Sequence, residues 1–303
     1  MFSFRRAEVL PVECYGKLPI AKDYLRVGCA EGAGAAWREW LDRAYSGGTG
    51  GTFPELAWPA NFVTGEAWGE PLVGGLWPSS DAGGLRKFPF TLLVERRRKA
   101  ARGDLDEGWS KSAAIWRELG ALRANAESSG DGQRFLAAMR GRELDLDTLE
   151  GTRESGIDFA TWRAAIDAGE DGLEKTLRRL SDLRRGGPRA VLRLPLVSNM
   201  DARGQARAWC SLCRSIGVLD PDRLPTILFP AGETSSAAFV VLAARVFAPS
   251  DTRWLEPPAQ TGAAGLEDLC DERVRVAALV PECAQPLANS LLGAWTSLQA
   301  RGA

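Results

Sequence analysis

The stretch that decides the fold, residues 78–95, reads P-S-S-D-A-G-G-L-R-K-F-P-F-T-L-L-V-E. Its second half, Phe88–Glu95, is rich in the aromatic and β-branched residues that strands favour. Its first half is a turn region with two adjacent glycines, which adopt positive φ without steric cost. Residues 68–77 before it are also strand-like. Two strands joined by a loop at 78–87 predict an antiparallel hairpin.

An earlier stretch of the same kind, residues 14–25, reads C-Y-G-K-L-P-I-A-K-D-Y-L. Both stretches combine turn-forming residues with an Asp, a Lys or Arg, and aromatic residues, and loops of this composition often carry function. The same side chains could instead serve only turn chemistry, with the Asp residues capping their own loops. Our candidates for a partner-binding surface are the charged and aromatic residues of the two loops, namely Lys17, Asp23, Tyr24, Asp81, Arg86 and Phe88.

The composition is that of a globular protein, with 45% hydrophobic and 25% charged residues in 303. A net charge of −1 gives no electrostatic footprint for nucleic acid or an anionic membrane. The start of the sequence lacks the apolar core of a secretory signal, and no apolar run approaches the ~20 residues of a membrane-spanning helix. Six cysteines are too few for a disulfide scaffold. We therefore expect a cytoplasmic protein with no nucleic acid partner and no membrane insertion.

The sequence contains no histidine, which removes every His-based catalytic triad and every His metal ligand. The glycines of residues 32–34 and 47–51 are not followed by Lys-Ser/Thr and do not form a strand–GxGxxG–helix unit, so they are not phosphate loops. We predict no catalytic residue, no metal site and no cofactor.

The sharpest local motif is a tryptophan followed by Cys-x-x-Cys, at Trp209, Cys210 and Cys213. Thiol–disulfide oxidoreductases place such a pair at a helix N-terminus, where the pKa of the first thiol is lowered. Here a helix is predicted over 202–216, so the pair lies inside it and we expect two small buried residues. A thiol–disulfide oxidoreductase that uses Cys210 and Cys213 remains the alternative function.

The order of predicted elements indicates an α/β fold with two units. We expect an N-terminal α/β domain at 1–140, a charged linker at 141–156 and a C-terminal α/β domain at 157–303. The basic run Arg96–Lys99 is interpreted as a solvated strand end. The predicted helices cover 34–44, 104–126, 133–140, 158–167, 173–185, 202–216 and 284–299, and the other predicted strands cover 7–15, 190–197, 225–229, 237–247 and 273–280.

Five short motifs follow one another along the chain, namely Gly16-Lys17-Leu18-Pro19, Asp23-Tyr24-Leu25, Trp37 with Trp40, Pro78-Ser79-x-Asp81 and Arg86-x-Phe88-Pro89. In their order and spacing these motifs resemble the N-terminal domain of the TagF (ImpM) family over residues 12–95. The chain departs from the family pattern at Lys22, where the family usually has Gly, and at Leu85, which stands as an extra residue.

This resemblance implies an accessory protein of the bacterial type VI secretion system. It further implies a non-enzymatic, post-translational repressor that acts by association with a forkhead-associated scaffold protein. For the fold, it implies an N-terminal domain of longin-like type, an antiparallel sheet flanked by helices. A longin-like binding module in another pathway remains a further alternative.

Overall fold

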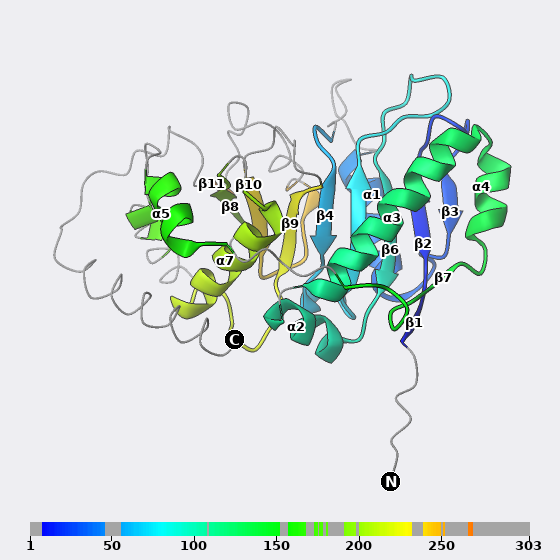
Figure 1. Cartoon of the computed structure of the whole chain (residues 1–303). Helices are drawn as coiled ribbons and strands as arrows, with labels where there is room; N and C mark the ends of the chain where they lie inside the picture. The colour runs from blue at the N-terminus through cyan, green and yellow to red at the C-terminus, as the bar shows by residue number, and fades with distance from the viewer. Residues whose placement is uncertain are drawn as a thin grey trace, which may run out of the picture.

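The computed structural model places a long mixed sheet at the centre of the molecule, with helices on both faces (Figure 1). It describes residues 8–45, 56–107, 109–151, 157–167, 173–174, 176–177, 180, 191–197, 200–231, 239–249, 251 and 266–268. The strands are β1 (Val9–Pro11), β2 (Glu13–Gly16), β3 (Leu25–Val27), β4 (Ala60–Val63), β5 (Leu72–Trp77), β6 (Phe90–Glu95), β7 (Glu143–Asp145), β8 (Val191–Pro195), β9 (Thr226–Pro230), β10 (Phe239–Ala243) and β11 (Leu266–Asp268). The helices are α1 (Gly32–Tyr45), η1 (Glu66–Trp68), α2 (Arg98–Asp106), α3 (Ser110–Ser129), α4 (Gly132–Met139), α5 (Phe159–Asp167) and α7 (Ala202–Ser215).

Within the described residues the sheet has nine strands in the order β11-β8-β10-β9-β4-β5-β6-β2-β3. Neighbouring strands run antiparallel except for β11 and β8, which are parallel. The predicted hairpin is confirmed: β5 and β6 pair from Leu72 opposite Glu95 to Trp77 opposite Phe90. The α/β fold with an antiparallel sheet flanked by helices is therefore confirmed.

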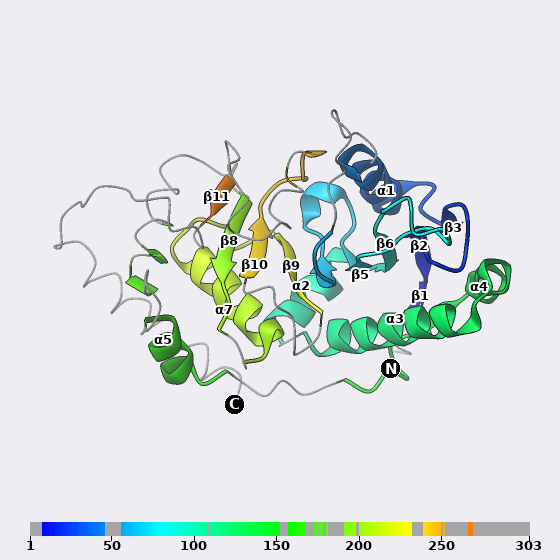
Figure 2. The ribbon, with the colours of Figure 1, turned by 90° about the horizontal axis from the view of Figure 1, so that it is seen from above.

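The helices divide between the two faces of the sheet (Figure 2). Helix α1 covers one face, and α2, α3 and α7 cover the other. Alternate residues of each strand enter different cores because strand side chains alternate between faces. Leu92 and Val94 of β6 pack into the core under α3, whereas Leu93 packs into the aromatic core under α1. Both faces are thus buried, which matches the almost continuous apolar run of β6.

The sheet crosses the predicted boundary between the two units. Strand β9 pairs antiparallel with β4, from Ala60 opposite Pro230 to Val63 opposite Ile227. The C-terminal strands therefore extend the N-terminal sheet. Part of the predicted linker is also ordered, because residues 143–145 form β7 and pair with β1 in a separate two-stranded sheet. The division of the chain at 141–156 stays a prediction.

The helix expected over 104–126 is wrong at its start. Two helices, α2 and α3, meet at a corner where Trp109 takes a left-handed φ of 60°. The carboxylate of Asp104 accepts from the backbone N–H groups of Lys111 and Ser112, at 2.8 and 2.7 Å, and so caps the second helix. A side chain of α2 therefore caps the beginning of α3.

The basic run 96–99 is not simply solvated. Arg96 is buried and pairs with Asp104, with 3.0 Å between Nη1 and Oδ2, and with Glu8 at 3.7 Å. Residues from Arg98 onward belong to α2. The sequence signal of a charge run does not reveal that its first member faces inward, because the carboxylate partners come from other elements.

Most other predicted elements agree with the structure where it describes them. The strand expected at 68–77 begins only at Leu72, and Trp68 instead ends the short helix η1. The strand expected at 7–15 is divided into β1 and β2 at Val12, and the strand expected at 237–247 is found as β10. The strand predicted at 273–280 and the helix predicted at 284–299 lie outside the described residues. Among the helices that the structure describes, none has the length and apolar character to cross a membrane.

Candidate functional site

The two loops singled out in the sequence lie together at one end of the sheet. The loop 17–24 joins β2 to β3, and the loop 78–89 joins β5 to β6. Strands β2 and β6 are neighbours, with Gly16 opposite Phe90. Gly16 has φ of +127°, and a Cβ there would lie 2.1 Å from the carbonyl oxygen of Pro89. Glycine is therefore required where the two loops leave the sheet.

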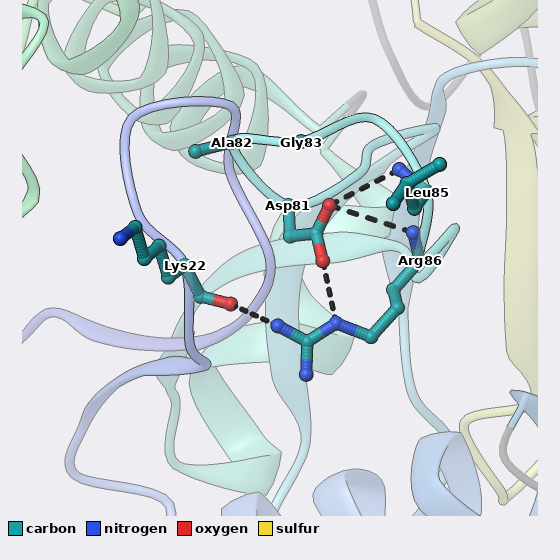
Figure 3. Close-up of a pocket in the computed structure, with 6 residues that line it drawn as sticks. All are labelled: Lys22, Asp81, Ala82, Gly83, Leu85 and Arg86. Carbon is teal, nitrogen blue, oxygen red and sulfur yellow. Dashed lines mark hydrogen bonds and ion pairs between the residues drawn. The ribbon is translucent and has the colours of Figure 1, made fainter.

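Asp81 organises the second loop (Figure 3). Its side chain is buried, and its Oδ1 accepts from the backbone N–H groups of Leu85 and Arg86, at 3.2 and 3.4 Å. Its Oδ2 accepts from Nε of Arg86 at 2.5 Å. The hydrogen bond from the Arg86 guanidinium lowers the pKa of this carboxyl below its ordinary value. Asp81 is thus a charged acceptor whose bonds fix the loop.

Arg86 joins the second loop to the first. Its Nη2 donates to the carbonyl oxygen of Lys22 at 2.5 Å, and the guanidinium lies 4.0 Å from a carboxylate oxygen of Asp23. The backbone adds a further link, since the Ala82 N–H donates to the carbonyl of Ala21 at 2.9 Å. The arginine side chain is still 58% exposed. Arg86 therefore holds the two loops together and also presents a positive charge to solvent.

An aromatic stack continues this surface into the core. Tyr24 is 41% exposed and stacks on Tyr15, with ring centroids 5.5 Å apart, while its edge contact with buried Phe88 is 4.9 Å. Tyr15 in turn donates its hydroxyl to Asp42 of α1 at 2.5 Å. Burial, followed by the hydrogen bond to this carboxylate, raises the pKa of Tyr15. Tyr24 is therefore held as a rigid, half-exposed ring.

Lys17 lies beneath that ring rather than in solvent. Only 2% of Lys17 is exposed, and its Nζ lies 4.2 Å from the centroid of Tyr24, a cation–π contact. Within the described residues Nζ has no hydrogen-bond acceptor. Burial, and then the nearby Arg86, lower the pKa of Lys17. Lys17 supports Tyr24 from below, although the sequence offered it as a contact residue in its own right.

The structure brings all six predicted site residues together, but it divides them into two layers. Asp23, Tyr24 and Arg86 face solvent, whereas Lys17, Asp81 and Phe88 hold the loops from inside. Asp81 and Arg86 line a hollow of about 460 Å³ together with four exposed residues that sequence reasoning left out of the site, namely Lys22, Ala82, Gly83 and Leu85 (Figure 3). The sequence signal that could have indicated Leu85 was an apolar residue within a glycine-rich turn.

The cysteine pair lies where the sequence predicted, inside a helix. Cys210 and Cys213 are buried in α7, which begins eight residues earlier at Ala202. Burial and the neighbouring Cys210 raise the pKa of Cys213 well above its ordinary value. In the part of the chain that the structure describes, no three His, Cys, Asp or Glu side chains are grouped to hold a metal ion.

Comparison with known proteins finds a family match for the part of the chain that contains both loops. Residues 13–140 match the family model described as the TagF N-terminal domain, type VI secretion system-associated. Among solved structures, the crystal structure of PA0076 from Pseudomonas aeruginosa PAO1 is similar, with 16% sequence identity and a TM-score of 0.41. That alignment covers 89% of this chain and 98% of the other. No curated protein sequence matches the chain.

Proposed function

We propose that this chain, which belongs to the TagF family of type VI secretion-associated proteins, is a non-enzymatic repressor of secretion that binds a forkhead-associated scaffold protein in the cytoplasm. The observation that carries the proposal is the surface formed by Asp23, Tyr24 and Arg86, all within the stretch that matches the family. Aromatic and arginine side chains are the residues from which protein interfaces draw most of their affinity.

The chemistry of the two loops supports binding rather than catalysis. The carboxylate of Asp81 accepts three hydrogen bonds from its own loop, and its lowered pKa keeps it charged. A general base needs a pKa near the working pH and a free lone pair toward its substrate. Lys17 is covered by the Tyr24 ring. The two buried ionisable groups of the site, Asp81 and Lys17, thus hold the shape of the surface.

The geometry disfavours the oxidoreductase alternative. A reactive cysteine needs a lowered pKa and partial exposure. Cys213 is buried, and its pKa is raised. Cys210 is also buried and lies in the middle of α7, away from the partial positive charge of the helix N-terminus. These observations favour two structural residues.

The test is a direct binding measurement with the purified scaffold protein from the same bacterium. Tyr24→Ala removes the half-exposed ring, and Lys99→Glu, at an exposed position on α2, is the control for a surface change elsewhere. We expect wild type and the control to bind, and Tyr24→Ala to bind at least tenfold more weakly, as loss of an aromatic anchor costs more than ~1.4 kcal/mol.

The same variants test repression in cells. Deletion of the gene should raise secretion by the type VI system, and Tyr24→Ala should fail to restore repression although its melting temperature shows that it folds. If the purified wild-type chain does not bind the scaffold, the proposed partner is wrong. If it binds and deletion leaves secretion unchanged, the proposed repression is wrong.

A further inference from the structure

We infer that Leu85, at the tip of the β5–β6 loop, inserts into an apolar pocket of a protein partner, and that the rim of this pocket is acidic. The inference rests on the proposed function, because it describes the partner surface that the same two loops would meet. It adds the contact residue and the chemistry of the surface that receives it. Its evidence is the exposure of Leu85, the rigidity of its loop and the charge around it.

Leu85 is unusual in its exposure. It is 89% exposed, whereas every other large hydrophobic residue that the structure describes is exposed to 43% or less. Its side chain stands beside Gly83 at the edge of the hollow shown in Figure 3. Burial of an exposed leucine side chain by a partner is favourable, because it removes apolar surface from water. The position of this residue therefore favours association with an apolar pocket.

The loop that carries Leu85 is fixed in place before any partner binds. The backbone N–H of Leu85 donates to Asp81, whose own N–H donates to the carbonyl of Arg86 at 3.2 Å. Gly84 donates to the carbonyl of Asp81 at 2.9 Å. Ordering a flexible loop lowers affinity, so a preformed loop keeps more of the burial free energy as binding free energy. Asp81 thus makes the tip a rigid projection.

The charge around Leu85 specifies the rim of the partner's pocket. The exposed ionic residues of the two loops and of β3 are four cations and one carboxylate, a local charge of 4 − 1 = +3 in a chain of net charge −1. Interfaces are electrostatically complementary, so this surface favours an acidic partner and faster association with it. The four cations are Lys22, Arg26, Arg86 and Lys87, and the carboxylate is Asp23.

An anionic lipid surface is the other partner that attracts cations and leucine. Stable membrane association takes either two lipid-like anchors or a long apolar helix face, and even one acyl chain gives only marginal binding. A single leucine offers much less apolar area than that. The cluster of four cations is also at the lower limit of lipid-binding clusters. The observations therefore favour a protein partner.

The first experiment places a photoreactive amino acid at position 85 of the full chain in the native cells. After irradiation, mass spectrometry identifies the cross-linked residue of the partner. We expect an adduct with an apolar residue that has Asp or Glu side chains around it, whichever protein supplies it. The same label at exposed Val246 is the control and should give no such adduct. An adduct at a basic surface, or none at position 85, overturns the inference.

The second experiment measures the affinity for the protein so identified. Leu85→Ser should weaken binding at least tenfold, and Val246→Ser, a matched exposed apolar position, should not. Lys22→Glu with Arg26→Glu should slow association and flatten its dependence on salt. Unchanged affinity in Leu85→Ser overturns the inference. So does Leu85-dependent binding to phosphatidylserine vesicles, which would assign the loop to a membrane.

The two proposals fail separately. If position 85 cross-links to an acidic, apolar surface of a protein other than the forkhead-associated scaffold, the inference stands and the proposed partner is wrong. If the scaffold binds and Leu85→Ser binds equally well, the proposed function stands and the inference is wrong.

Discussion

Replacing Gly16 with alanine tests whether the junction of the two loops depends on close backbone contact. Its φ of +127° lies outside the small left-handed region that side chains tolerate, and the added Cβ would meet three backbone atoms of Pro89 and Phe90 at 2.1–3.0 Å. Positive φ alone costs about 1–2 kcal/mol, and overpacking against backbone adds about 1–3 kcal/mol. We expect Gly16→Ala to lose about 2–5 kcal/mol of unfolding free energy.

The matched control is Gly130→Ala. Gly130 also has positive φ, at 64°, but nothing lies within 4 Å of its added Cβ, so only the backbone cost of about 1–2 kcal/mol applies. Urea unfolding of both variants, followed by tryptophan fluorescence, measures the difference. If Gly16→Ala loses no more than Gly130→Ala, the close approach of β2 to Pro89 does not constrain the fold and the reasoning is refuted.

Four further predictions follow from other contacts. Asp104→Ala leaves Arg96 buried without its nearest carboxylate and should cost about 3–5 kcal/mol in urea unfolding, and a loss below 1 kcal/mol would show that the pair is not structural. Lys17→Met should leave stability unchanged or higher. Because the pKa of Lys17 is lowered in the folded protein, the unfolded chain binds more protons at pH values between the folded pKa and the ordinary 10.5. In this range the melting temperature of the wild type should therefore rise with pH relative to that of the variant. Equal pH dependence of the two melting temperatures would contradict this. Cys213→Ala should cost roughly 1–2 kcal/mol, and the wild-type thiol should label slowly until the protein unfolds; fast labelling of the folded protein would instead indicate a reactive cysteine. Limited proteolysis should first cut within 141–156, and a first cut inside a central strand would remove the predicted division of the chain.

Local signals in the sequence were enough to predict the hairpin of β5 and β6. The apolar run of Phe90–Glu95 and the turn residues before it act within one short stretch. The helix α1 was likewise predictable, since Trp37, Trp40, Leu41 and Ala44 recur at helical spacing and are all buried. Both features depend on signals that lie within one short stretch of the chain.

The rest of the site depends on contacts between distant residues, which no local pattern records. The burial of Lys17 follows from Tyr24 folding over it, and the inward position of Arg96 follows from Asp104 and Glu8. The exposure of Leu85 follows from the hydrogen bonds that Asp81 makes to the backbone of its own loop. A hydrophobic residue in a sequence is expected inside, so its exposure can be recognised only after the loop is placed.

The position of β9 supports the proposal that the loops, rather than the sheet, meet a partner. β4 would be an edge strand of the family-matched stretch, but its free backbone groups pair with β9. The other end of the sheet is β3, three residues long, and it follows directly after Tyr24. Both sheet faces are covered by helices over these strands (Figure 2). The exposed side chains that we propose for partner recognition therefore lie beside β3, on the two loops that Gly16 and Asp81 hold together.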